Sequence, residues 1–206
     1  MKNKILCLSF ITTLGLVSTA FAQQTEYKAH LTALNTSKTG TAAVGDASFK
    51  VRGDNLVIKI SMKNTPPNIQ HWEHFHGNPD GSPAKCVSSA QDANKDGLID
   101  LIETVSGTTM VPFNDAPHEM HIPTDTYPVA DNKGRFSYTK VVPLKTLEKN
   151  FATKFNNGTL NLENRVLYVH GVPKTTQLPK TVQGAVGNYG TDVTLPIACG
   201  KIVRVK

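Results

Sequence analysis

Cysteine, aromatic residues and long hydrophobic runs are all scarce in this chain. Three cysteines in 206 residues exclude a small domain held together mainly by disulfides. The one mostly apolar run, residues 5–19, is shorter than the roughly 20 residues of a membrane-spanning helix, so we expect no membrane span. The formal net charge is +6, but the lysines are scattered and form no basic helix. This distribution argues against nucleic-acid binding and favours, if anything, a small anionic partner.

The first 22 residues have the pattern of a signal peptide. Lys2 and Lys4 precede the apolar run, and Ala20-Phe21-Ala22 is a small-x-small cleavage sequence. We therefore expect cleavage after Ala22 and a periplasmic or secreted protein. The remaining residues, 23–206, are long enough for a single domain with its own hydrophobic core.

Two cysteines stay in the chain once Cys7 leaves with the signal peptide. These are Cys86 and Cys199, and two thiols in an exported protein most often pair. In the chain-entropy model, a bridge that closes so long a loop contributes on the order of 4–5 kcal/mol to stability.

Alternating apolar and polar residues predict an all-β domain. Gly53-Asp54 joins two such runs as a hairpin with one face exposed to water. Strands are expected at 27–34, 47–52, 56–63, 70–76, 135–142, 165–170 and 193–205, with a short helix at 144–155. Residues 77–128 and 171–190, rich in turn-forming residues, predict two long functional loops. The sum is a sandwich or barrel of about eight antiparallel strands.

Three of the seven histidines lie within residues 70–81, which read QHWEHFHGNPDG. His74 and His76 are two residues apart, so on a strand their side chains share one face. His170 ends another predicted strand and can supply a third imidazole. Three histidines with an open position suit a redox copper or a hydrolytic zinc. The alternative for the pair alone is two surface histidines beside a loop. His71 points to the other face and is interpreted as structural.

Residues 92–103, DANKDGLIDLIE, match the calcium-binding loop of EF-hands. Gly97 supplies the sharp turn at position six, and Ile99 is the apolar residue expected to pack the loop. Oxygen ligands are expected from Asp92, Asn94, Asp96, the Leu98 carbonyl, Asp100 and Glu103. The flanks are not two good helices, so a lone calcium loop that orders its surroundings is expected. The alternative is an acidic surface turn.

Several motifs together resemble the copper/zinc superoxide dismutases. His71-Trp72-Glu73-His74-Phe75-His76 is similar to the His-x-x-His-x-His strand of that family, whose last two histidines bind copper. Residues 165–170 resemble the strand with its last copper histidine. Ala198-Cys199-Gly200 resembles its C-terminal motif, and Val129-Ala130-Asp131 with Gly134 resembles the turn into a later strand.

This resemblance covers nearly the whole chain after residue 22, in order, and carries specific implications. It implies an eight-stranded Greek-key barrel and a disulfide between Cys199 and Cys86 in the long loop. It also implies copper held by His74, His76 and His170, and superoxide as substrate.

The chain departs from the family at two places. Residues 86–92 contain no histidine to bridge copper and zinc, and Pro196 stands where the family has an arginine that guides superoxide. Arg165, Lys201 and Arg204 are candidate substitutes for that arginine.

A second metal site, for zinc, is a further candidate. His121 falls near the end of the region that resembles the family's zinc loop, with His118 before it and Asp125 after it. These residues are alternatively ordinary loop residues.

Three functions remain open from the sequence. The first is a superoxide dismutase-like enzyme with a copper site. The second is a non-enzymatic module that binds copper or calcium outside the cytoplasm. The third is a structural extracytoplasmic domain. The sequence leaves activity, native metal and oligomeric state undecided.

Overall fold

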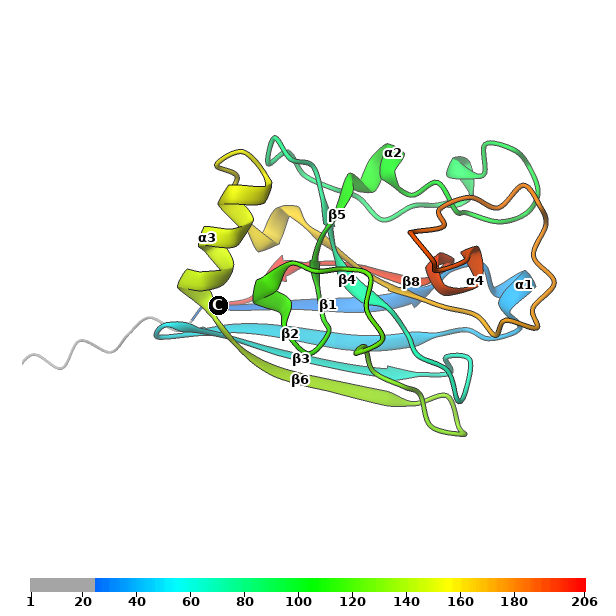
Figure 1. Cartoon of the computed structure of the whole chain (residues 1–206), viewed down its shortest axis with the longest axis horizontal. Coiled ribbons are helices and arrows are strands. Elements are labelled where there is room, and N and C mark those ends of the chain that lie inside the picture. The colour runs from blue at the N-terminus through cyan, green and yellow to red at the C-terminus, as the bar shows by residue number, and fades with distance from the viewer. Residues whose placement is uncertain (1–24) are drawn as a thin grey trace, which may run out of the picture.

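The computed structural model describes residues 25–206, so the predicted signal peptide and its cleavage point after Ala22 lie outside the described residues. The chain forms mainly β-strands, with short helices in the connections (Figure 1). The strands are β1 (Thr25–Ala33), β2 (Val44–Arg52), β3 (Asn55–Lys63), β4 (Glu73–Gly77), β5 (Thr108–Pro112), β6 (Phe136–Pro143), β7 (Val166–His170), β8 (Pro196–Lys201) and β9 (Val203–Arg204). The helices are α1 (Thr36–Thr39), α2 (Glu103–Ser106), α3 (Leu144–Lys154) and α4 (Thr191–Thr194), with 3₁₀ turns η1 (Ser89–Gln91), η2 (Pro117–Glu119) and η3 (Leu162–Asn164).

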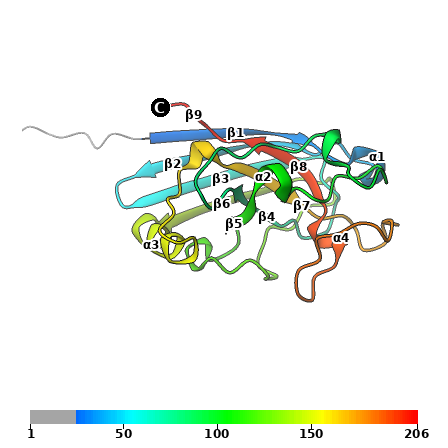
Figure 2. The same cartoon turned by 90° about the horizontal axis from the view of Figure 1, so that it is seen from above.

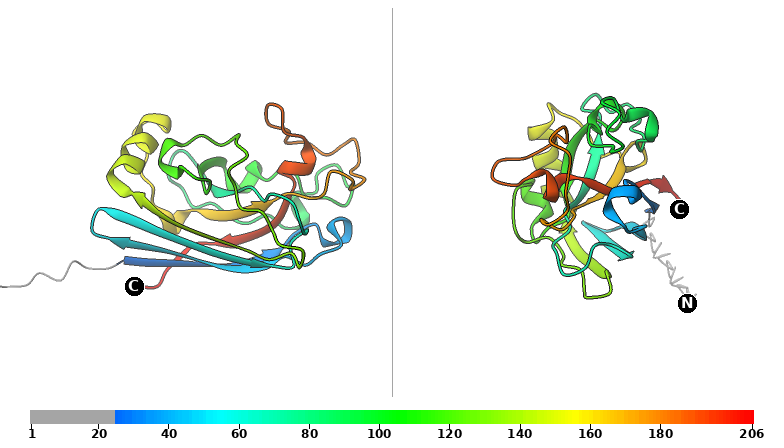
Figure 3. Two further views of the ribbon diagram at one scale, coloured as in Figure 1. Left: turned by 60° about the horizontal axis from the view of Figure 1, so that its bottom comes forward. Right: turned by 90° about the vertical axis from the view of Figure 1, so that its right-hand side faces the viewer.

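The strands form one antiparallel sheet with the order β5-β4-β7-β8-β1-β2-β3-β6, and β9 pairs with β1. The sheet curls over, so that β1, β2, β3 and β6 face β5, β4, β7 and β8 (Figure 3). Consecutive strands β3 and β4 lie in different halves, and β6 returns to pair with β3 in a Greek-key path. The predicted all-β barrel or sandwich is confirmed.

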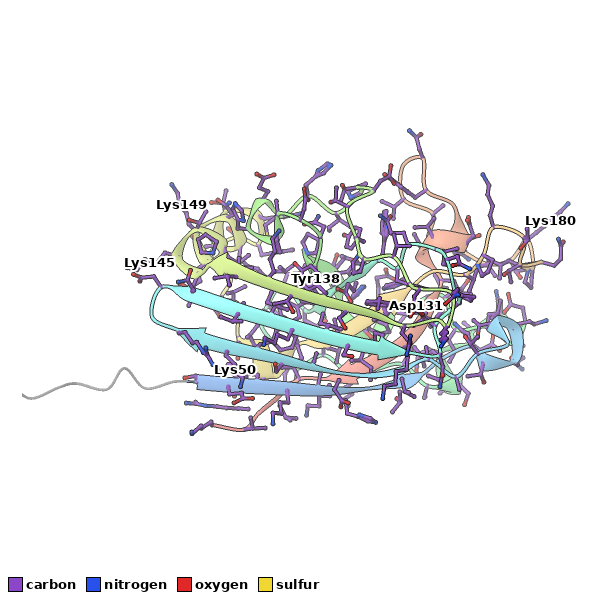
Figure 4. All side chains as sticks on the ribbon, turned by 90° about the horizontal axis from the view of Figure 1, so that it is seen from below. Lys50, Asp131, Tyr138, Lys145, Lys149 and Lys180 are labelled. Atoms are coloured by element: carbon purple, nitrogen blue, oxygen red, sulfur yellow. A yellow bond between two sulfur atoms is a disulfide. The ribbon has the colours of Figure 1, made fainter. Side chains whose placement is uncertain are left out.

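The hydrophobic core fills the space between the two halves. Phe49 of β2 lies 5.1 Å from Phe75 of β4 and 5.8 Å from Phe113 between ring centroids. The opposite face of β1, β2, β3 and β6 is polar and faces outward, with Lys50 paired to Glu26 on it (Figure 4). This one-sided burial is what the alternating sequence predicts.

Two local predictions are confirmed. Strands β2 and β3 pair up to Arg52 opposite Asn55, and Gly53 closes the turn with a φ of +56°, a backbone conformation that favours glycine. The predicted helix at 144–155 is α3, which buries Leu147 and Phe151.

Three strand predictions need correction. The long loop contains an unpredicted strand, β5, whose short run Thr108–Pro112 does not alternate and lies among turn residues. The strand predicted at 193–205 is broken into α4, β8 and β9, because Leu195 is extended before Pro196. Strand β4 begins at Glu73, whereas Gln70 makes only an isolated bridge with Val129.

The predicted disulfide joins Cys86 to Cys199 and spans 113 residues of sequence. It ties the loop after β4 to strand β8. In the same region, the Tyr168 hydroxyl accepts a hydrogen bond from the Val87 N–H and pairs with Ser106 Oγ at 2.7 Å. No helix within residues 25–206 is long and apolar enough to cross a membrane.

Candidate metal centre

Strands β4 and β7 carry the three predicted metal-binding histidines. They pair antiparallel, with His74 opposite Tyr168 and His76 opposite Val166. His170 lies two residues beyond Tyr168 and therefore on the same face as His74 and His76. The pairing of β4 with β5 shifts between His74 and His76, an irregularity of the kind that re-aims side chains beside functional sites.

The three imidazoles converge. The ring centroid of His74 lies 4.9 Å from that of His76 and 4.5 Å from that of His170, and the last two lie 6.1 Å apart. One nitrogen from each ring lies within 4.8 Å of the other two. Within residues 25–206, no other set of three or more His, Cys, Asp or Glu side chains brings its ligand atoms so close together. Each histidine is at most 4% exposed.

Hydrogen bonds orient the rings and leave nitrogens free to bind. The Nδ1–H of His76 donates to the Gly107 carbonyl at 3.1 Å, and that of His170 donates to the Thr194 carbonyl at 2.6 Å. The His170 Nε2 and the His74 Nδ1 are buried and have no hydrogen-bond partner within residues 25–206. His76 Nε2 lies 3.1 Å from Thr109 Oγ1.

This pattern fits a metal ion. A buried polar atom without a partner is unfavourable, and a ligating histidine normally donates its other N–H to a carbonyl or carboxylate. His76 and His170 each donate one N–H to a backbone carbonyl, as ligating histidines do. His74 and His170 each keep one nitrogen without a hydrogen-bond partner in residues 25–206. That the group binds a metal remains a prediction, which the geometry favours.

Burial also keeps the imidazoles neutral. Burial first, and then the nearby His170 ring, lowers the pKa of His76 to about 3, and burial lowers the pKa of His170 to about 4. The pKa of His74 falls well below its usual value, through burial first and then through the two other histidines. Protons therefore do not compete with a metal for these nitrogens at neutral pH.

The histidines lie in a narrow pocket of about 50 Å³. Its wall comes from several distant segments, and α2 lies over β4 and β5 (Figure 2). The residues that line the pocket are Trp72, His74, His76, Asp100, Ile102, Glu103, Thr109, Ile122, His170, Gly184, Val186 and Thr194. Trp72, which is buried, is therefore part of the pocket wall.

His71 does not belong to the group, as predicted, but strand alternation is not the reason because β4 begins after it. Its Nδ1 and Nε2 each lie 2.9 Å from a carbonyl oxygen, of His170 and Pro66 respectively. Its ring stacks on Phe136 at 5.4 Å. His71 therefore ties the loop before β4 to the end of β7.

Glu73 is a buried carboxyl that no sequence motif singles out as functional. Its side chain is fully buried on the core face of β4, and neither oxygen has a hydrogen-bond partner. Burial raises the pKa of Glu73 well above its usual value. It lies near Tyr127 and Tyr138, whose pKa values are raised by burial and then by the Glu73 charge.

The predicted calcium loop has a tight turn in the structure. The Asp92 carboxylate accepts the N–H groups of Asp96 and Gly97 at 3.2 and 3.0 Å, and the φ of Gly97 is +83°. Asp96 Oδ1 accepts the Leu98 N–H at 2.9 Å. Leu98 is fully buried, whereas Ile99, the residue expected to pack the loop, is only partly buried.

The acidic side chains of this loop do not gather around one point. Asp96 accepts a hydrogen bond from Thr181 Oγ1, and Asp100 accepts one from the Gln183 N–H at 2.7 Å. Asp100 and Glu103 line the histidine pocket. The calcium site therefore stays a prediction.

His118, His121 and Asp125 are not brought together as a metal-binding group. The carbonyls of His118 and His121 accept hydrogen bonds from Asn150 and Asn114. Partial desolvation and the Asp125 carboxylate raise the pKa of Tyr189. The second metal site stays a prediction without geometric support.

None of the candidate substitutes for a guiding arginine lines the pocket, which corrects that expectation. Arg165 is only 1% exposed and donates to three backbone carbonyls. These are the carbonyls of Leu160, Asn78 and Thr159, at 2.8–2.9 Å. Lys201 and Arg204 are exposed outside the pocket.

Comparisons with known proteins give little beyond the fold. No family model matches the chain, and no curated protein matches it. Among solved structures, it is similar to the Cu/Zn superoxide dismutase from Brucella abortus, with 21% sequence identity and a TM-score of 0.42. That match covers 85% of this chain and 98% of the other. So distant a likeness carries no conclusion about activity.

The buried histidines make a testable prediction about the metal-free protein. Their pKa values are lower in the folded state than the usual 6.5. Below pH 6.5 the unfolded chain binds protons that the folded chain does not, so the free energy of unfolding falls as the pH drops towards about 4. Each buried histidine contributes at most about 1.4 kcal/mol per pH unit.

Denaturant unfolding between pH 7.5 and 4.5 measures this slope. The His170→Gln variant, which cannot take up a proton there, should show a shallower slope than wild type. Thr139→Ser changes an exposed side chain that does not titrate and should leave the slope unchanged. Equal slopes for wild type and His170→Gln would contradict the assigned pKa shift.

Proposed function

We propose that this chain is an exported copper-binding protein in which His74, His76 and His170 hold one copper ion. The observation that carries the proposal is the convergence of three buried, neutral imidazoles, of which His74 Nδ1 and His170 Nε2 have no hydrogen-bond partner among residues 25–206. Imidazole nitrogens suit both copper and zinc, and copper(II) is bound more tightly than zinc by such ligands. When bound, copper supplies one-electron redox chemistry and Lewis acidity.

Two observations support a location outside the cytoplasm. Disulfides persist in oxidising compartments, and Cys86 is bonded to Cys199. The signal-peptide pattern of the first 22 residues agrees with this location. Export to the periplasm or to the medium is therefore part of the proposal.

Binding of copper without turnover is favoured over dismutation of superoxide. An anionic substrate is usually guided by positive charge, and no Lys or Arg within residues 25–206 lines this pocket. Dismutation remains the second candidate because the order of the motifs resembles the superoxide dismutases. Activity of the copper-loaded protein above that of free copper would establish it.

Copper titration of the metal-free protein tests the main proposal. We expect one equivalent of copper to bind to wild type, and binding to be lost in the double variant His74→Ala/His76→Ala. The metal content after buffer exchange measures this directly. His30→Ala, which removes an exposed histidine of β1, is the matched control and should retain copper. Retention of a full equivalent by the double variant would rule out the proposed site.

We also propose that residues 92–103 bind calcium. The spacing of the oxygen ligands and the turn at Gly97 support this proposal. Binding would draw the carboxylates of the loop together around the ion, and an affinity on the order of 0.1–1 mM is expected for an extracellular loop.

Thermal unfolding tests calcium binding. Millimolar calcium should raise the melting temperature of the metal-free protein, because an ion that binds only the folded state stabilises it. The shift should disappear in Asp96→Ala, which removes the ligand oxygen, and persist in Asp80→Ala, whose exposed carboxylate lies outside the loop. An equal shift in both variants, or a shift of the same size with magnesium, would contradict a specific calcium loop.

A further inference from the structure

The wall of the histidine pocket carries charge of one sign. Asp100 and Glu103 are its ionisable members besides the histidines, and no Lys or Arg of the described chain lines it. Asp100 is 8% exposed, whereas Glu103 is exposed at the start of α2. The two carboxylates therefore lie at different depths on one side of the pocket.

Both carboxylates line the same pocket as the histidines. The Gln183 N–H donates to Asp100 Oδ2 at 2.7 Å, which fixes that carboxylate against the segment that carries Gly184 and Val186. Glu103 is close enough to Tyr168 for its charge to add to the effect of burial in raising the pKa of Tyr168. The Tyr168 ring lies edge-on to the His76 ring at 5.0 Å.

The unpartnered nitrogens lie in the same pocket. His74 Nδ1 and His170 Nε2 are buried without hydrogen-bond partners. The same pocket therefore combines two carboxylates with neutral nitrogen lone pairs. A low-dielectric cleft lined by negative charge concentrates cations and repels anions.

We infer that Asp100 and Glu103 are uptake residues that draw a copper cation to the histidines and disfavour a small anion at the same pocket. The inference rests on the proposed copper site. The two carboxylates would make the site favour cations over anions, whereas three neutral histidines alone do not discriminate against an anionic ligand. It also makes the protein a better acceptor of copper ions than a catalyst for an anionic substrate.

The position of the two carboxylates links copper uptake to calcium. Asp100 and Glu103 are also positions nine and twelve of the predicted calcium loop. A calcium ion in that loop would neutralise them, so copper uptake should be slower with calcium than without it. The uptake measurements therefore begin in buffer from which calcium has been removed by a resin.

Stopped-flow mixing of copper(II) with the metal-free full chain tests the inference. Trp72 is the one tryptophan of the chain and lines the pocket, so quenching of its fluorescence reports copper arrival. At low ionic strength, Glu103→Gln should take up copper about five- to ten-fold more slowly than wild type, and Glu103→Lys more slowly still. The differences should shrink at high salt, which screens charge.

Glu163→Gln is the matched control, because it removes an exposed charge outside the pocket. It should load copper at the wild-type rate. Asp100→Asn is expected to slow uptake as well, and circular dichroism checks that its fold is intact. In the copper-loaded protein, Glu103→Lys should bind azide more tightly than wild type, as measured by absorption.

The outcomes separate this inference from the proposed function. If wild type shows no quenching beyond that of His170→Ala, the copper site itself is wrong. If wild type loads copper but Glu103→Gln and Glu103→Lys load at the rate of Glu163→Gln, the uptake role is overturned and the copper site stands. Azide binding that is unchanged in Glu103→Lys would overturn the proposed selectivity against anions.

Discussion

The antiparallel pairing of β4 with β7 is the constraint on which the candidate metal centre depends. It sets His74 opposite Tyr168 and thereby places His170 on the same face as His74 and His76. Because side chains alternate along a strand, a slip of one residue would turn the histidines of one strand into the core. The core residue Phe75, between the two histidines of β4, opposes such a slip through its contacts with Phe49 and Phe113.

The same ladder connects the centre to the disulfide. Tyr168 of β7 pairs with Cys199 of β8, and Cys199 is bonded to Cys86 in the loop after β4. That loop continues to Gly107, whose carbonyl orients His76. The disulfide thus ties to β8 the same loop whose Gly107 carbonyl orients His76.

Burial explains why this centre is suited to a cation. Removing three imidazoles from water is unfavourable unless their nitrogens find partners. Residues 25–206 supply no partner for His74 Nδ1 and His170 Nε2, and a bound cation would supply one. Within residues 25–206, the wall adds two carboxylates and no Lys or Arg side chain. Arg165, the nearest candidate in the sequence for guiding an anion, is instead used to hold three backbone carbonyls.

Much of the fold could be predicted from the sequence because it depends on local pattern. The hairpin of β2 and β3 follows from alternation and Gly53, and α3 follows from helical spacing. The histidine group could be predicted because His74 and His76 are two residues apart on a strand and His170 ends another. Strand β5 could not, since its short run has no alternation of its own and is defined by pairing with β4.

The residues that line the pocket could not be predicted from the sequence either. Asp100 and Glu103 could be assigned a role only within their own loop, and their position beside the histidines depends on how that loop folds over β4. Alternation along β4 places Glu73 on the same face as Phe75, but its burial depends on the segments that pack there, including those of Tyr127 and Tyr138. Such features depend on contacts between distant segments, which local spacing does not encode.

A crystal structure of the copper-loaded protein, with anomalous scattering recorded at the copper absorption edge, tests the central claim most directly. The account predicts one strong anomalous peak within bonding distance of His74 Nδ1, His76 Nε2 and His170 Nε2. A peak at any other place, or none in this pocket at full copper loading, would contradict it.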